Sequence, residues 1–492
     1  MRSTFLVALV LAATSYSPFV TAVPVAIPDG QLYERGYYPT FPTFGGKGGN
    51  AQTGDSGNAN GGDVINEGWK IINGPFSNTA GNGGFTGTGF AYGGNGFLGG
   101  GNAATGDSGN ANGGSVINSG GRIINGPGAN HAGNGGTSVS GNAYGGHAKR
   151  GFPSFPAPAK GGNAKTGNSG NVNGGDIVND AWSLYNGPFS NIAGNGGYTG
   201  TGTAYGGFSY GGGGNAVSGD SGNANGGSVS NSGATVINGF GANHGGNGGT
   251  SQSGAAFGGN AKRGYPYTPF PSFGQGGNAH TGDSGNANGG DVVNQGGYIW
   301  NGWGANTAGN GGFTGTGNAY GGYGPGGGGN AVTGNSGNAN GGSVYNGGNT
   351  VINSAGANHA GNGGTSVSGN AYGGNAKRGY YTPYFPTFGT GGNAHSGNSG
   401  NANGGDVVNE GGYIWNGWGA NTAGNGGFTG TGLAAGGNGF GGGGNAVSGN
   451  SGNANGGSVY NGGGTVINNA GANHAGNGGT SVSGNAYGGN AY

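Results

Sequence analysis

The sequence predicts an all-β, Gly/Asn-rich repeat fold in which short strands stack in a β-solenoid-like arrangement. Eight copies of a 47-residue repeat occur, and no copy contains an insertion or deletion. Glycine supplies 145 of the 492 residues and no apolar face recurs at helical spacing. Helices are therefore excluded, because glycine is unfavourable in a helix interior. Seven columns hold asparagine in all eight copies, which is typical of side-chain ladders between stacked strands.

The copies are arranged in pairs, with five residues between the two members of each pair. They span 48–94 and 100–146, 161–207 and 213–259, 276–322 and 328–374, and 391–437 and 443–489. The two members of a pair differ at many positions but keep one length. Constant length with variable side chains indicates a registered structure, since disordered low-complexity sequence tolerates changes in length.

The asparagine columns predict ladders in which each side-chain amide both donates and accepts a hydrogen bond. In the first copy these columns are Asn50, Asn58, Asn60, Asn66, Asn73, Asn78 and Asn82. Two further columns are always alanine, at Ala51 and Ala91, and the columns of Val64 and Ile71 are always aliphatic. We expect the small residues of the strands to face inward.

Alternating residues predict short strands, broken by Gly-Gly and Asn-Gly turns, at 50–63 and 137–144. In the first stretch, one side would carry Ala51, Thr53, Gly57 and Ala59. Two coils of about 23 residues would then fit into each copy. A thin Gly-rich β-sandwich is the alternative, as is a chain that stays largely disordered until it assembles.

The N-terminus has the features of a secretory signal peptide over residues 1–22. Arg2 supplies the positive charge, residues 5–13 the apolar stretch, and Val20-Thr21-Ala22 the small residues of a cleavage site after Ala22. The apolar stretch is too short to span a bilayer. We therefore expect an extracellular or cell-wall protein. It contains no cysteine, which excludes a disulfide scaffold.

The low charge of the chain argues against several classes of partner. Charged residues make up 5% of the sequence and the formal net charge is zero. Binding to nucleic acid or to a membrane surface through a basic patch has no support. Uncharged sequence rich in asparagine and glycine instead favours β association, so self-assembly is the expected state.

Pairs of basic residues divide the chain into units of nearly equal length. Lys149-Arg150, Lys262-Arg263 and Lys377-Arg378 end the first three units, and Arg35 ends a short propeptide over 23–35. The four units are 36–150, 151–263, 264–378 and 379–492, and each holds two copies. This spacing predicts a precursor that is cut after each basic pair.

The signal peptide, the tandem units and the Ala-Lys-Arg-Gly boundaries at 148–151, 261–264 and 376–379 resemble fungal kexin-processed repeat proteins. The resemblance covers the layout of the chain and not the repeat sequence. It implies that a Golgi kexin cleaves after each Lys-Arg pair. The structural members of that group, the repellents, are cysteine-free wall peptides that form amyloid-like fibrils.

Aromatic residues distinguish the first copies from the second. The six tryptophans, all in first copies, are Trp69, Trp182, Trp300, Trp303, Trp415 and Trp418. They either stack on sugar rings of a wall polysaccharide or pack as the hydrophobic contact of each unit. Second copies carry Asn-His instead, at 130–131, 243–244, 358–359 and 473–474. These histidines are too far apart in sequence to indicate a metal site, and we interpret them as polar turn residues.

Two motifs of enzymes and metal proteins are rejected. Gly-Asp-Ser-Gly at 54–57 resembles a serine-protease nucleophile, but four of the eight copies replace its aspartate with asparagine. Asp63 recurs only in first copies, which is too sparse for calcium-binding β-roll repeats and favours a cap on a strand turn. No catalytic residue, metal site or cofactor is expected.

These observations predict a secreted, non-enzymatic structural precursor. A kexin-type protease would cut it into four homologous β-rich units, which would self-assemble in the cell wall or extracellular matrix. Two alternatives remain. One is an uncut β-solenoid that binds polysaccharide or ice through a flat Asn/Thr face. The other is a precursor of bioactive peptides, in which the aromatic, proline-rich arms after each boundary are the active part.

Overall fold

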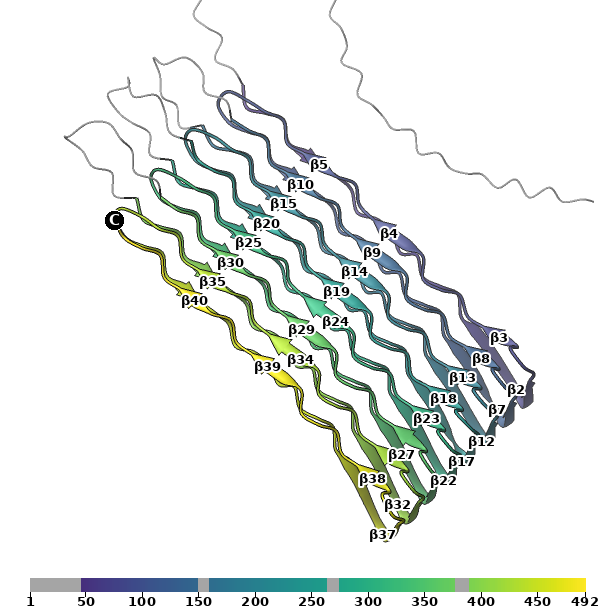
Figure 1. The fold of residues 1–492 in the computed structure, drawn as a ribbon. Helices are drawn as coiled ribbons and strands as arrows, with labels where there is room; N and C mark the ends of the chain where they lie inside the picture. Colours follow the sequence, from purple (N-terminus) through teal and green to yellow (C-terminus); the bar gives the residue numbers. More distant parts are fainter. Residues whose placement is uncertain (1–45, 149–158, 263–273, 377–388) are drawn as a thin grey trace, which may run out of the picture. The chain divides into compact units, whose positions relative to one another are not determined.

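A computed structural model describes residues 46–148, 159–262, 274–376 and 389–492. Within these ranges the chain is all-β and contains no helix, as predicted. Each 47-residue copy forms one flattened coil with five strands, and we number the coils 1 to 8 in chain order. The coils stack in parallel, so each strand pairs with the equivalent strands of the neighbouring coils (Figure 1). The predicted β-solenoid-like fold is confirmed.

Each copy makes one coil, so the prediction of two coils per copy is wrong. Val64 pairs with Val116 in the next coil, 52 residues later, and Val116 pairs with Ile177, 61 residues later. The two halves of a copy lie opposite each other as the outgoing and returning layers of one coil. Backbone hydrogen bonds join the layers, as from Gly81 N to Gly62 O at 2.9 Å. Such bonds need two backbones in direct contact, which glycine permits.

Two parallel sheets belong to the outgoing half of the coils. The β1 sheet lies near the start of this half, and the β2 sheet lies at the far end, where the chain turns into the returning half. The β1 sheet contains β1 (Ala51–Gln52), β6 (Ala103–Ala104), β11 (Ala164–Lys165), β16 (Ala216–Val217), β21 (Ala279–His280), β26 (Ala331–Val332), β31 (Ala394–His395) and β36 (Ala446–Val447). The β2 sheet contains the ten-residue strands β2 (Val64–Asn73), β7 (Val116–Asn125), β12 (Ile177–Asn186), β17 (Val229–Asn238), β22 (Val292–Asn301), β27 (Val344–Asn353), β32 (Val407–Asn416) and β37 (Val459–Asn468).

Three parallel sheets form the returning half. The β3 sheet contains β3 (Asn78–Thr79), β8 (Asn130–His131), β13 (Asn191–Ile192), β18 (Asn243–His244), β23 (Asn306–Thr307), β28 (Asn358–His359), β33 (Asn421–Thr422) and β38 (Asn473–His474). The β4 sheet contains β4 (Phe85–Gly87), β9 (Thr137–Val139), β14 (Tyr198–Gly200), β19 (Thr250–Gln252), β24 (Phe313–Gly315), β29 (Thr365–Val367), β34 (Phe428–Gly430) and β39 (Thr480–Val482). The β5 sheet contains β5 (Ala91–Tyr92), β10 (Ala143–Tyr144), β15 (Ala204–Tyr205), β20 (Ala256–Phe257), β25 (Ala319–Tyr320), β30 (Ala371–Tyr372), β35 (Ala434–Ala435) and β40 (Ala486–Tyr487).

The outgoing segment between the β1 and β2 sheets is extended, but it is not the strand that alternation predicted over 50–63. Only Ala51–Gln52 forms a strand there. In coil 2 every third residue of the equivalent segment is buried, at Thr105, Ser108, Ala111 and Gly114, and Gly106 is buried as well. Three residues per turn is typical of a polyproline II helix. The glycines in this segment allow the three-residue period, because the two layers contact each other through their backbones.

The second predicted strand, over 137–144, is interrupted. It consists of β9 and β10 with residues 140–142 between them in no strand. The alternation there is real at both ends, since Ser138 and Ala143 are buried while their neighbours are partly exposed.

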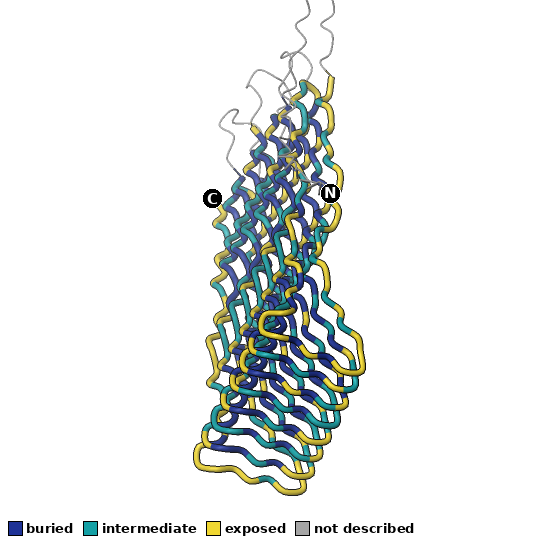
Figure 2. The backbone as a smooth tube through the Cα atoms, turned by 90° about the vertical axis from the view of Figure 1, so that its right-hand side faces the viewer, coloured by how far each residue is buried: buried dark blue, intermediate teal, exposed yellow. Residues whose placement is uncertain are grey.

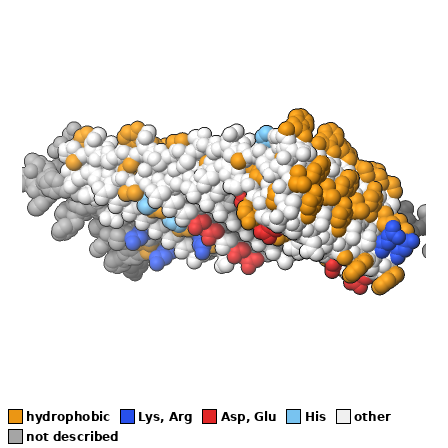
Figure 3. All heavy atoms as spheres, turned by 90° about the horizontal axis from the view of Figure 1, so that it is seen from below, with side chains coloured by type: hydrophobic (Ala, Val, Ile, Leu, Met, Phe, Trp, Pro, Cys, Tyr) orange, Lys and Arg blue, Asp and Glu red, His pale blue; other side chains and the backbone are white. Residues whose placement is uncertain are grey.

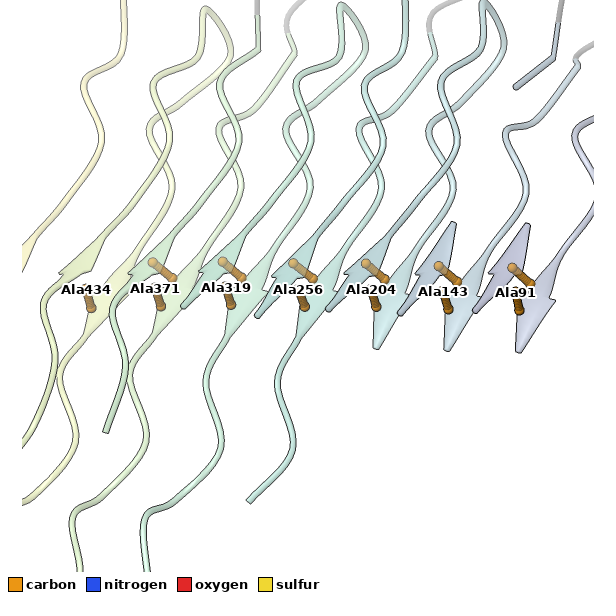
Figure 4. Packing of buried hydrophobic residues seen from close by; sticks show 13 residues of the cluster. Ala91, Ala143, Ala204, Ala256, Ala319, Ala371 and Ala434 are labelled. Atoms are coloured by element: carbon orange, nitrogen blue, oxygen red, sulfur yellow. The ribbon is translucent and has the colours of Figure 1, made fainter. Parts of the chain in front are cut away.

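The core between the layers is built from small residues. The alanines equivalent to Ala51 and Ala91 form two facing rows, and Figure 4 shows the row from Ala91 to Ala434 running along the stack. Rows equivalent to Val64 and Ala80 form a second cluster, and the row of Ile71 forms a third. Larger side chains would not fit: a Cβ on Gly162 would overlap the carbonyl oxygen of Gly101.

Candidate assembly surfaces

Three of the seven asparagine columns form the predicted amide ladders, inside the far end of the coils. Their members are equivalent to Asn66, Asn73 and Asn78. Between coils 2 and 3 the Nδ2 to Oδ1 distance is 2.8 Å in each ladder, for Asn118 to Asn179, Asn125 to Asn186 and Asn130 to Asn191. Weaker bonds connect the ladders, as from Asn118 Nδ2 to Asn130 Oδ1 at 3.3 Å. The buried amides therefore form one continuous network.

The other four columns, equivalent to Asn50, Asn58, Asn60 and Asn82, bond differently. Their side-chain oxygens accept hydrogen bonds from the backbone N–H groups of the next coil, at 2.8–3.0 Å between coils 1 and 2. The prediction of amide-to-amide ladders is wrong for these columns. They lie on the outer surface, where water satisfies the amide nitrogen and the side chain can cap a backbone N–H.

All three buried ladders have the same direction, because each amide donates to the following coil. At the first coil, the Oδ1 atoms of Asn66 and Asn73 accept no bond from the described residues. At the last coil, Asn468 and Asn473 accept from coil 7 and donate to no described residue. One end of the stack therefore presents acceptors and the other end donors.

The outer face of the last coil is uncovered by any described residue. Asn468 and Asn473 are exposed there, whereas the equivalent Asn353 and Asn358 in coil 6 are completely buried. Figure 2 shows this change from buried inner coils to exposed end coils. Solenoids normally end in a polar cap, and an uncovered coil presents unpaired strand edges.

Contacts across a unit boundary are the same as those within a unit. β7 pairs with β12, across the first boundary, from Val116–Ile177 to Asn125–Asn186. β2 pairs with β7, within the first unit, over the same length of strand. The sheets therefore do not distinguish one unit from two.

The basic pairs follow residues that are anchored in the stack. Ala148, Ala261 and Ala376 are buried, and each forms a bridge to the preceding coil. Of the predicted processing residues, only Lys262 lies in the described ranges; it is exposed and its backbone N–H donates to Ser209 O at 2.6 Å. The others lie outside the described residues: Ala22, Arg35, Lys149, Arg150, Arg263, Lys377 and Arg378.

The tryptophans lie on the outer surface and do not form the hydrophobic contact of each unit. Trp69, Trp182, Trp303 and Trp418 are exposed, and Trp300 and Trp415 are partly exposed. They fall in three different rows around the β2 sheet and the turn that follows it. Figure 3 shows hydrophobic side chains in rows over this end of the coils. The alternative that they stack on sugar rings stays a prediction.

The four histidines of the second copies lie on strands of the β3 sheet rather than in turns. They line a groove of about 1370 Å³, where they belong to the same row as Thr79 and lie beside the row equivalent to Asn82. Histidines occur on alternate coils, which places them about 9.6 Å apart, too far for one metal ion. Burial lowers the pKa of His244 below its usual value of 6.5. The groove is lined by imidazoles, hydroxyls and amides, together with alanine, isoleucine and phenylalanine side chains.

Two Thr/Ser rows that could form a flat Thr face point inward instead. Thr105 and Ser138, which belong to them, are buried. Thr105 Oγ1 donates to Gly141 O at 3.1 Å, and Ser138 Oγ donates to Gly109 O at 2.9 Å. These hydroxyls satisfy glycine carbonyls between the layers. They are not available to an external ligand.

Asp63 is confirmed as a capping residue. Its Oδ1 accepts the backbone N–H of Ser115 in the next coil at 2.7 Å, and Ser115 Oγ accepts that of Asp176 at 3.1 Å. Aspartate and serine alternate along this row in all eight coils. The alternation avoids carboxylates about 4.8 Å apart on successive coils.

A row of stacked aromatic rings on the outer face of the β5 sheet was missed by the sequence analysis. The rings are Tyr92, Tyr144, Tyr205, Phe257, Tyr320 and Tyr372, with centroids 4.7–5.1 Å apart and planes within 8°. Burial and the neighbouring Tyr144 raise the pKa of Tyr205. The available signal was an aromatic residue directly after the invariant alanine in seven copies.

Comparisons with protein-family models, curated proteins and solved structures find no match to this chain. Among the residues that the structure describes, no helix is long and apolar enough to cross a membrane. No group of three or more His, Asp or Glu side chains in the described ranges is placed to hold a metal ion.

Proposed function

We propose that this chain is a secreted, non-enzymatic structural precursor whose units stack end to end into fibrils of a cell wall or extracellular matrix. A kexin-type protease would cut it after the Lys-Arg pairs. The observation that carries the proposal is the complementarity of the two ends of the stack. On the last coil, amide donors of the kind that are buried in the inner coils lie uncovered. Matching amide oxygens, which can accept hydrogen bonds, lie on the first coil.

Stacking of a second molecule would continue every ladder in register. Asn468 of one molecule would donate to Asn73 of the next molecule, its equivalent in the repeat, and Asn473 would donate to Asn78 in the same way. The joint would place a second-copy coil before a first-copy coil, which is the order found at each unit boundary. This contact is head-to-tail, since the last coil of one molecule meets the first coil of the next. Such a contact does not close on itself and gives an open filament.

The composition of the last coil favours this joint. Residues 443–492 contain no Lys, Arg, Asp or Glu. Charged side chains are a common protection against edge-to-edge association of strands. Their absence leaves backbone and amide groups to pair, which is the source of cohesion in cross-β assemblies.

Cleavage would change the number of pieces that can assemble. Because contacts across a boundary equal those within a unit, a cut unit of two coils would present the same ends as the whole chain. Four units cut before folding would stack in the same way. The processing step would therefore set the number of growing pieces and leave their joining surface unchanged.

Alanine substitutions on the outer face of the first coil test end-to-end assembly. A Cβ on Gly57 or Gly62 would meet nothing within 4 Å, but the same change at the equivalent Gly109 or Gly114 would overlap carbonyl oxygens of the preceding coil. The Gly57→Ala/Gly62→Ala chain is expected to fold with an unchanged melting temperature. It should fail to form filaments, as measured by electron microscopy and light scattering.

Phe85→Thr provides the matched control, because second copies carry threonine in this row on the flank of the coil. This variant should form filaments at the wild-type rate. Filament growth by the double glycine variant at that rate would contradict the proposal.

The groove lined by histidine, threonine and asparagine favours a second function, binding of wall polysaccharide. The Asn82-type side chains use their oxygens within the stack, so their amide nitrogens can donate to sugar hydroxyls. The glycine variant separates the two functions. A monomeric chain that still binds an insoluble polysaccharide would support recognition.

A further inference from the structure

The tyrosine row on the β5 sheet is a set of pairs held in face-to-face contact. Tyr92 and Tyr144 have ring centroids 4.7 Å apart with planes at 3°, and Tyr144 and Tyr205 are 4.9 Å apart at 3°. Tyr320 and Tyr372 are 5.1 Å apart at 8°. Parallel pairing of the β5 sheet aligns the two rings of each pair in one register.

No other in-register position of the described strands pairs two tyrosines. Tyr185 lies between Ile124 and Ile237, and the other tyrosines of the β2 and β4 sheets likewise have aliphatic, threonine or other non-aromatic neighbours. The β5 row is thus distinct in chemistry from the rest of the strands. None of its rings is fully buried: Tyr92 is 62% exposed, Tyr205 is 37% exposed, and Tyr144, Tyr320 and Tyr372 are partly exposed.

We infer that the β5 row is a site of oxidative tyrosine cross-linking, in which a secreted peroxidase with hydrogen peroxide joins neighbouring coils. The pairs are Tyr92 with Tyr144, Tyr144 with Tyr205, and Tyr320 with Tyr372. Phe257 interrupts the row and cannot form a phenoxyl radical. Ala435 interrupts it again before Tyr487.

The chemistry removes two electrons and two protons from each pair. Each phenol gives one electron and one proton to the oxidant and becomes a phenoxyl radical, with unpaired spin partly on the Cε carbons. A Cε–Cε bond forms between the two rings. Each of these carbons then loses its hydrogen as a proton while the phenolic oxygen regains one, which restores both aromatic rings. The two electrons and two protons reduce one hydrogen peroxide to two waters.

The pair Tyr144 and Tyr205 gives the cross-link a consequence for processing. Tyr144 precedes the Lys149-Arg150 pair and Tyr205 follows it. A bond between them would keep the first two units covalently joined after cleavage. Hydrogen-bonded stacking would then become permanent at that boundary.

A further pair would form at the joint between molecules, and this part rests on the proposed end-to-end assembly. Tyr487 on the last coil is 56% exposed and lies in the same row as Tyr92 on the first coil. Stacking in register would bring them together. The three intramolecular pairs do not depend on assembly, so the two ideas can fail separately.

The test treats the full-length secreted chain, as a dilute monomer, with a peroxidase and hydrogen peroxide. Protease digestion and mass spectrometry then identify linked peptides that lack two hydrogen atoms. We expect links at the three pairs of the row. Linked peptides only from tyrosines outside the row, or equal yields of the three links from a urea-unfolded chain, would overturn the inference.

Two variants keep the ring in place and change only its reactivity. Tyr144→Phe should lose two of the three links and retain that between Tyr320 and Tyr372. Phe257→Tyr should gain links to Tyr205 and Tyr320. The Tyr345→Phe control, in the β2 sheet, should leave all three links unchanged. If the Tyr144→Phe variant still forms links from position 144 to the neighbouring rings, the mechanism is contradicted.

In filaments, a fourth link between Tyr487 and Tyr92 is expected. Filaments that yield the three intramolecular links without the fourth would overturn the joint geometry and leave the intramolecular site intact.

Discussion

At the scale of the residue, Asn179 shows why asparagine occupies the interior of this fold. Its oxygen accepts from Asn118 at 2.8 Å and from Asn125 at 3.3 Å. Its nitrogen donates to Asn191 at 3.3 Å and to Asn231 at 2.9 Å. The side chain is completely buried, so each of these groups would lack any partner without the ladder. A primary amide is suited to such a column because it carries donors and an acceptor together.

A substitution in a buried asparagine ladder is expected to reduce stability more than a substitution in an exposed asparagine column. Asn179→Ala should lower the free energy of unfolding by about 1–3 kcal/mol, since it leaves buried donors and acceptors unsatisfied. Asn195→Ala, in an exposed column of the same coil, removes one bond, which the backbone N–H of Asn247 donates to the Asn195 Oδ1 atom at 2.8 Å. Water can replace that bond, so a loss below about 1 kcal/mol is expected. Urea unfolding of both variants makes the comparison. Equal losses would show that burial does not set the strength of the ladders.

At the scale of the element, the turn after each strand of the β2 sheet combines backbone strain with aromatic packing. Phe76 and Phe189 have φ values of 54° and 52°, in the left-handed region that favours glycine. The other six coils have glycine at this position, at φ values of 55–62°. A Cβ on Gly128 would lie 2.6 Å from Cε1 of Phe76, so the phenylalanine ring of coil 1 lies over the glycine of coil 2.

This overlap predicts that two glycines with the same backbone respond differently to substitution. Gly304→Ala adds a Cβ with nothing within 4 Å, and should cost about 1 kcal/mol of backbone strain. Gly128→Ala has the same strain and must also displace the ring of Phe76. Thermal melting should therefore show the larger decrease for Gly128→Ala. The Phe76→Ala/Gly128→Ala double variant measures the coupling, and additive effects would contradict the overlap.

At the scale of the whole molecule, the sheets continue across the unit boundaries without any change in pairing. Each described end of a boundary is anchored in the stack, by Ala148 before the first and by Lys160, which bridges Gly99 and Gly212, after it. A cut between these anchors breaks one peptide bond and leaves the strand pairing of the described residues in place. The stability of the stack comes from nearest-neighbour contacts between coils, as in other solenoids.

The folded chain is therefore expected to survive cleavage as one particle. Treatment with a kexin-type protease should give pieces of 115, 113, 115 and 114 residues on a denaturing gel, after removal of residues 1–35. Size-exclusion chromatography in native buffer should still show a single particle close to the size of the uncut protein. Separation of the pieces in native buffer would mean that the inter-unit sheets do not hold. An uncut Lys262→Ala/Arg263→Ala boundary serves as the internal control.

The sequence by itself determined the fold class, the eight-fold repeat and the seven asparagine columns through which neighbouring copies form hydrogen bonds. Fixed copy length and invariant asparagines require registered stacking, and glycine content excludes helices, so these features need no knowledge of distant contacts. The Asp/Ser alternation at Asp63 and Ser115 was also readable as a capping pattern. In each case the physical cause acts between equivalent positions of neighbouring copies.

Only the tertiary structure decided how one copy closes into one coil, and which face each column takes. The outgoing and returning layers contact through glycine backbones, as between Gly62 and Gly81, and this contact leaves no side-chain pattern to read. It also sets the three-residue period at Thr105 and Ser108, where alternation was expected. Asn50 and Asn66 look the same in sequence, but one caps a backbone on the surface and the other donates inside the core. The tyrosine stack depends in the same way on register between coils, which no single copy contains.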